Sequence, residues 1–190
     1  MVNADDLLML MDPQGSGKYI RYDEAVSTFD SRYGLREYGE IWVHDVDVGI
    51  TLAAQDTWYQ VTAWSNTVTS FSYDGHNGEA NGVTPDASND HLTILTTGIY
   101  MVHWWVSCYS GATNEFHLQM RRNNNSKGFP NTSGFRTTST ASAVGHVAGG
   151  GLCALNANDT IELWVERKDG GAVSKTLTIR AATLAVFLMQ

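Results

Sequence analysis

Apolar side chains recur at every second position along residues 116–121 and 161–166. A period of two is typical of a β-strand with one face toward the core and the other toward water. We therefore expect two strands here, whose polar side chains, among them Glu162 and Glu166, face solvent. These two carboxylates lie four residues apart, about 13 Å along a strand, and we expect them to pair with Arg167 or Lys168.

Two longer segments are apolar on both faces. In residues 98–109, Ile99, Met101 and Trp105 face one way, while Tyr100 and its alternate neighbours, also apolar, face the other. Residues 176–189 repeat this pattern. A strand that is apolar on both sides needs a second cover, and no helix-period segment follows residue 41. The pattern predicts that a neighbouring copy of the chain covers the second face.

The remaining strands are short and are separated by clusters of Asn, Asp and Gly, which predicts an all-β antiparallel sandwich or jelly roll. We expect the polar stretches 74–90 and 123–134 to be surface loops, because they are too long for hairpin turns. The predicted strands are 41–48, 57–64, 68–73, 91–96, 98–109, 114–122, 135–140, 143–155, 159–167 and 176–189.

Residues 1–40 differ from the rest of the chain, because their apolar residues recur at helical spacing in two short runs, near residues 3–11 and 23–33. Helices this short are marginal alone, so we expect an arm that folds against its own domain or a partner. The predicted organisation is an N-terminal anchoring arm, 1–40, and a jelly-roll domain, 41–190. The apolar residues expected to make the arm's contacts are Leu7, Leu8, Leu10, Met11, Val26 and Phe29.

Composition and charge restrict the partners. The chain has 190 residues, 43% of them hydrophobic, and a net charge of −8. One folded core is expected. Residues 37–120 hold ten acids and no Lys or Arg, which argues against nucleic acid as a partner. No run of 18 apolar residues predicts membrane insertion, and the acids near the N-terminus are unlike a secretory leader.

No motif predicts catalysis, a cofactor or a bound metal. The run QGSGK lacks the spacing and preceding strand of a phosphate-binding loop, and the six histidines form no pair at metal-ligand spacing. The acids of the 74–90 stretch match no calcium loop, so we expect solvated turn residues. Glu162 and Glu166 are too far apart for paired-carboxylate glycoside hydrolysis. Cys108 and Cys153 lie in apolar runs, as buried free thiols do.

Three segments together resemble the jelly roll shared by the complement globular head and tumour necrosis factor. They are TTGIYMVHWWVS at 96–107, LCALNANDTIELWV at 152–165 and the apolar C-terminal strand. The resemblance covers residues 57–190 and implies a homotrimer whose axis is lined by residues of the two strands that are apolar on both faces. The residues expected at this trimer interface are Tyr100, Val102, Trp104, Trp105, Leu184, Val186, Phe187 and Leu188.

The preceding segment, 39–64, is similar to the one that leads into this domain in structural proteins of tailed bacteriophages. That resemblance implies a non-enzymatic virion protein, assembled in the host cytoplasm. The expected role is a capsid decoration or cement protein that binds the major capsid protein, or another virion protein, through its arm. The alternative is the receptor-binding head of a tail or head fibre, which would recognise a host surface saccharide. Its expected exposed loop residues are Asp74, Asn77, Asn124, Phe129 and Asn131.

Overall fold

The computed structural model describes residues 37–62, 80–86, 88–139, 143–170 and 173–189. Several expectations fall outside these ranges. They are the six residues chosen as arm contacts, the expected strand 68–73, and two of the expected loop residues, Asp74 and Asn77.

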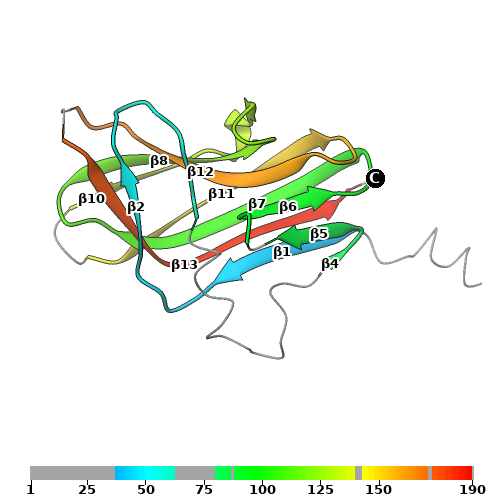
Figure 1. Ribbon diagram of the computed structural model, residues 1–190, viewed down its shortest axis with the longest axis horizontal. Coiled ribbons are helices and arrows are strands. Elements are labelled where there is room, and N and C mark those ends of the chain that lie inside the picture. Colours follow the sequence, from blue (N-terminus) through cyan, green and yellow to red (C-terminus); the bar gives the residue numbers. More distant parts are fainter. Residues whose placement is uncertain (1–36, 63–79, 87, 140–142, 171–172, 190) are drawn as a thin grey trace, which may run out of the picture. The chain divides into compact units, whose positions relative to one another are not determined.

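The first sheet is antiparallel and is built around the two strands whose sequences are apolar on both faces. Its order is β11 (Gly145–Leu155), β7 (Gly98–Tyr109), β13 (Lys175–Leu188), β1 (Tyr38–Val43) and β4 (Ala80–Asn81). β2 (Val48–Leu52) pairs with the first part of β13, and β1 pairs with the second part. The register of β13 against β7 shifts between Ile179 and Ala181. β7 and β13 are thus the central strands of this sheet (Figure 1).

The second sheet is also antiparallel. Its order is β10 (Gly134–Thr138), β8 (Asn114–Arg122), β12 (Thr160–Arg167), β6 (His91–Ile94) and β5 (Val83–Asp86). Two short strands also pair with it: β3 (Tyr59–Gln60) with β12, and β9 (Lys127–Gly128) with β8. A 3₁₀ turn, η2 (Pro130–Thr132), connects β9 to β10. The described residues therefore form the expected all-β antiparallel sandwich.

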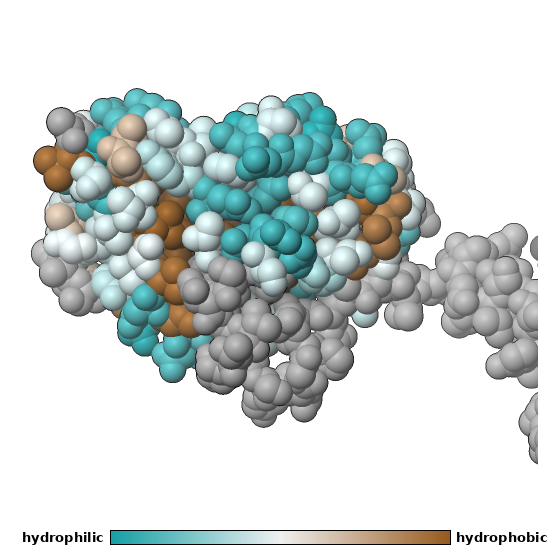
Figure 2. Space-filling model, viewed as in Figure 1, coloured by the Kyte–Doolittle hydropathy of each residue, from teal (hydrophilic) through white to brown (hydrophobic). Residues whose placement is uncertain are grey.

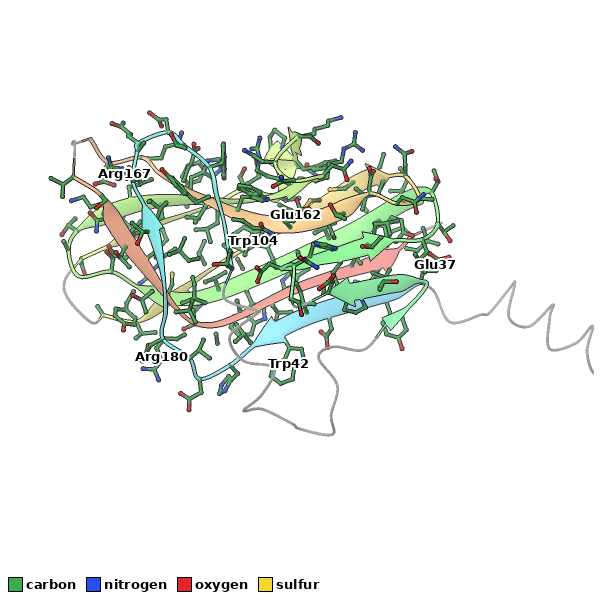
Figure 3. All side chains as sticks on the ribbon, in the orientation of Figure 1. Glu37, Trp42, Trp104, Glu162, Arg167 and Arg180 are labelled. Carbon is green, nitrogen blue, oxygen red and sulfur yellow. The ribbon has the colours of Figure 1, made fainter. Side chains whose placement is uncertain are left out.

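The core lies between the two sheets, as the period of two requires. β8 and β12 contribute Phe116, Leu118 and Leu163, which are fully buried, and β7 contributes Trp104. The indole of Trp104 lies between the sheets (Figure 3), and its Nε1 donates a hydrogen bond of 2.8 Å to the carbonyl oxygen of Thr132. Gly149 of β11 lies next to this hydrogen bond. A Cβ atom at position 149 would overlap the Thr132 carbonyl and the Trp104 ring.

The expected strands 98–109 and 114–122 match β7 and β8 at both ends. Other expectations were wrong. β1 begins at Tyr38, inside the segment assigned to the arm, and ends at Val43, and the strand that follows, β2, was not expected. Residues 80–81 and 83–86 form strands within one expected loop, and residues 127–128 form a strand within the other. These strands contain Pro, Gly or polar residues, which have a low intrinsic preference for β structure. Their backbone pairing with β13, β1, β6 and β8 stabilises them instead.

Candidate functional site

The outer face of the first sheet carries exposed apolar side chains that lie side by side. In the register of β7 with its two neighbours, Met101 is opposite Leu152 of β11 and Phe187 of β13. Ile99 lies two residues away on the same face of β7. These four side chains are 36% to 53% exposed, and Met189, whose backbone N–H donates to the carbonyl of Ile99, is 40% exposed. We call Ile99, Met101, Leu152, Phe187 and Met189 the apolar face.

Two tryptophans extend this surface along the sheet. Trp105 of β7 is opposite Thr183 of β13, and Thr183 is opposite Trp42 of β1. Both indoles are partly exposed. Figure 3 shows Trp42 projecting from β1 on the side away from Trp104. The view in Figure 2 is mostly polar, with apolar residues in a central band and near the end that holds the C-terminus.

The expected trimer-interface residues fall into two groups. Trp105 and Phe187 do lie on the outer face, and Leu188 is partly buried against the core. Alternation separates two faces of a strand, but when both are apolar only the position of the second sheet decides which one points inward. Whether another subunit covers the apolar face stays a prediction. The selection of the following residues for a surface between subunits was wrong, because they are fully buried between the sheets: Tyr100, Val102, Trp104, Leu184 and Val186.

The outer face of the second sheet is not the solvated surface that the sequence suggested. Glu162 and Glu166 are 3% and 4% exposed, and His117 is 9% exposed. The segment before β3 covers this side: Asp56 accepts a hydrogen bond of 2.9 Å from the Nζ atom of Lys168, and Trp58 packs against His117.

Glu166 does pair with Lys168, as expected, at 2.7 Å between Oε1 and Nζ. The hydrogen bonds that Glu166 and Asp56 accept raise the pKa of the Lys168 ammonium. Glu162 accepts hydrogen bonds from the hydroxyl of Thr160, at 2.5 Å, and from Nε1 of Trp164, at 3.4 Å. Buried carboxylates of this kind need such partners, and no local pattern in the sequence indicated them.

Both ring nitrogens of His117 have hydrogen-bond partners. Its Nδ1 is 2.8 Å from Oε1 of Glu166, and its Nε2 is 3.0 Å from the hydroxyl of Ser133. Phe135 stacks on the imidazole, with 4.2 Å between ring centroids and 9° between planes, while Trp58 meets it edge-on at 4.9 Å. The sequence did not single out His117 among the six histidines, because its partners come from distant segments.

The expected binding loop 123–134 is a compact structure. Asn124 and Asn131 are exposed, as expected, although the Nδ2 atom of Asn131 donates to the carbonyl of Leu152 at 2.9 Å. Phe129 is buried, at 9% exposure, so its selection as an exposed residue was wrong. The cationic groups of Arg122 and Lys127 lie 5.9 and 5.7 Å from its ring. The sequence does contain one signal that Phe129 is buried: it is the one aromatic residue in the polar stretch 123–134, and it directly precedes a proline.

The acids of the other loop have structural roles where they are described. Asp86 accepts hydrogen bonds from the backbone of Ser88 and Asn89, and the Nδ2 atom of Asn89 bonds its carboxylate at 2.7 Å. The Asn89 side chain is the main cause that lowers the pKa of Asp86. This agrees with the expected turn acid. Asp90, by contrast, is 7% exposed rather than solvated.

Both cysteines are buried free thiols, as expected, and burial raises the pKa of each to about 11. Among the described residues, no three His, Cys, Asp or Glu side chains are grouped as a metal ion would require. In the same part of the chain no helix is both long and apolar enough to cross a membrane.

No protein-family model matches this chain. No curated protein matches it either. Among solved structures it is similar to Eiger TNF from S. frugiperda, with 12% identity, a TM-score of 0.50, and coverage of 82% of this chain and 94% of that one. It is also similar to murine APRIL at pH 5.0, with 13% identity, a TM-score of 0.49, and coverage of 81% of this chain and 100% of that one. For the globular domain of zebrafish complement 1qA protein the identity is 14%, the TM-score is 0.47, and the coverage is 82% of this chain and 98% of that one. At such identities the likeness to Eiger establishes the fold, a tumour necrosis factor-like jelly roll.

Proposed function

We propose that this chain is a non-enzymatic structural protein of a tailed-phage virion that works as a homotrimer. The observation that carries the proposal is the apolar face of the first sheet. Single exposed apolar residues are common on proteins, whereas the largest contiguous apolar patch of a domain, typically about 300–600 Å², is often functional.

The size of the apolar face supports burial by sister copies. Its five side chains are between 36% and 53% exposed, and at about 200 Å² for each free side chain they present roughly 400 Å² to solvent. A stable interface buries about 800 Å² per partner, of which roughly two thirds is apolar in homodimers. The apolar face would thus form the centre of such an interface, with Trp42 and Trp105 at its border.

The capsid role rests on the residues that precede β1, which contain the six apolar side chains expected to make the arm's contacts. We propose that their apolar side chains bind the major capsid protein or another virion protein. Three arms on one trimer multiply a weak contact through effective concentration, and a protein that binds only the assembled shell stabilises it by mass action.

The test of this role is a full-length variant in which Leu7, Leu8, Leu10 and Met11 are replaced by serine. We expect it to sediment as the wild type does but to lose co-sedimentation with phage capsids assembled without this protein. Capsid binding equal to that of the wild type would refute the arm assignment. Binding by neither protein would refute the decoration role itself.

The exposure of Asn124 and Asn131 favours a second candidate, a fibre head that recognises a host surface saccharide. Asn side chains suit adaptable hydrogen bonding to hydroxyl groups. This role predicts that the purified protein binds host cells, and that replacing both asparagines by alanine abolishes the binding while circular dichroism shows that the variant is still folded at the assay temperature.

A further inference from the structure

Three polar side chains on the outer face of the second sheet form a chain of hydrogen bonds. The pairing of β8 with β12 places His117 opposite Glu166, and the pairing of β8 with β10 places Phe135 opposite His117. Ser133 lies two residues before Phe135, at the end of η2. The hydroxyl of Ser133 thereby reaches His117 from one side, while Glu166 reaches it from the other.

The partners of the imidazole determine its tautomer. A carboxylate only accepts hydrogen bonds, so the 2.8 Å contact with Glu166 requires that Nδ1 of His117 carry a proton. In the neutral ring Nε2 then has a lone pair, which faces the Ser133 hydroxyl at 3.0 Å. A nucleophile within hydrogen-bond reach of a base, with the base oriented by a third group, is the arrangement that activates serine for acyl transfer.

The surroundings hold this arrangement in place. Phe135 and Trp58 pack against the imidazole ring from two sides. Nε2 of Gln119 donates to the Ser133 hydroxyl at 3.0 Å, and Nη1 of Arg121 in turn donates to the side-chain carbonyl of Gln119 at 2.8 Å.

Burial decreases along the chain of hydrogen bonds. Glu166 is 4% exposed, His117 is 9% exposed, and Ser133 is only half-buried. Ser133 is thus the least buried residue of the three, as a reaction with an external ester requires. Ser133 has ordinary extended backbone angles, so any reactivity comes from its hydrogen-bond partners and not from backbone strain.

We propose that Ser133 is an activated nucleophile that accepts the acyl group of a small activated ester. Oγ forms a bond to the acyl carbon, its proton passes to Nε2 of His117, and the bond to the leaving alcohol breaks as that proton is transferred to it. The product is an O-acylserine. Glu166 is a positioning residue, since it acts only through His117. The proposal goes beyond the structural role and does not depend on it.

The test uses the full-length protein and an alkyl fluorophosphonate, which forms an Oγ–P bond with activated serines and releases fluoride. Peptide mapping by mass spectrometry should find the adduct at Ser133. It should be absent in Ser133→Ala and unchanged in Ser126→Ala, since Ser126 is an exposed serine whose hydroxyl donates to a backbone carbonyl. 4-Nitrophenyl acetate should likewise acetylate Ser133.

The role of the base is tested with His117→Ala. Loss of a general base slows such reactions by about 10²- to 10⁴-fold, and added imidazole should restore part of the labelling rate. Glu166→Gln removes the carboxylate that accepts from Nδ1 of His117, so labelling of Ser133 at a fixed pH should slow, whereas Glu166→Asp, which keeps a carboxylate, should retain more of the rate. Absence of any adduct at Ser133 in the wild-type protein overturns the proposal, and so does labelling of His117→Ala at the wild-type rate.

Discussion

Replacing Phe187 by serine tests whether the apolar face is buried between copies. Phe187 is 47% exposed, so about 100 Å² of its side chain is available to a partner. At about 25 cal/mol per Å² this surface contributes about 2.5 kcal/mol per copy, or about 7 kcal/mol in a trimer. Because about 1.4 kcal/mol is a factor of ten, the trimer dissociation constant should rise about 10⁵-fold. The concentration at half-dissociation varies as its square root and should rise roughly 300-fold.

Sedimentation equilibrium over a dilution series measures this concentration. Phe135→Ser is the matched control, because Phe135 is 58% exposed but lies on the outer face of the other sheet. Equal shifts in the two variants would show that the apolar face is not the interface. A wild-type protein that stays monomeric at the highest concentration would refute self-association as a whole.

Three further predictions concern the fold itself. Trp104→Phe removes the donor to the Thr132 carbonyl and should lower the free energy of unfolding in urea by about 1–3 kcal/mol. Gly149→Ala should destabilise by about 1–3 kcal/mol through overlap with the same contact, whereas Gly111→Ala, where a Cβ would meet nothing within 4 Å, should leave the melting temperature unchanged. Burial raises the pKa of Asp159, but hydrogen bonds from the Asn156 backbone, Asn123 and Arg122 outweigh this effect and leave the pKa below 3.8. The contribution of the Asp159 carboxylate to the free energy of unfolding is therefore present above that pH and is lost as the pH falls further. The difference in unfolding free energy between wild type and Asp159→Asn should therefore shrink below about pH 4, and a constant difference would contradict this assignment.

The strand pattern was predictable where alternation is undisturbed. β7 and β8 were located from sequence to the residue, and the prediction that Trp104 and Trp105 face opposite ways is confirmed. Local alternation could not tell which face of β7 is internal, because that depends on the position of β8 and β12. The interface residues were therefore chosen mainly from the wrong face.

The polar network could not be predicted from sequence for a different reason. An alternating strand predicts that Glu162 and Glu166 face away from the core, and they do, but it does not predict that another segment covers them. That cover comes from residues near Trp58, in a much earlier part of the chain, and from the turn that holds Ser133. Side chains that act together here are joined only by long-range strand pairing.

The backbone N–H of Leu188 donates to the carbonyl of Glu37 at 2.7 Å, and Tyr38 is opposite Phe187, so β1 begins where β13 ends. A pulling force applied between Glu37 and Leu188 would therefore break the hydrogen bonds between β1 and β13 one after another, and the force needed at each step would be small. The same adjacency makes the domain suitable for circular permutation, since a short linker could join Leu188 to Glu37 and new termini could be opened at Gly111.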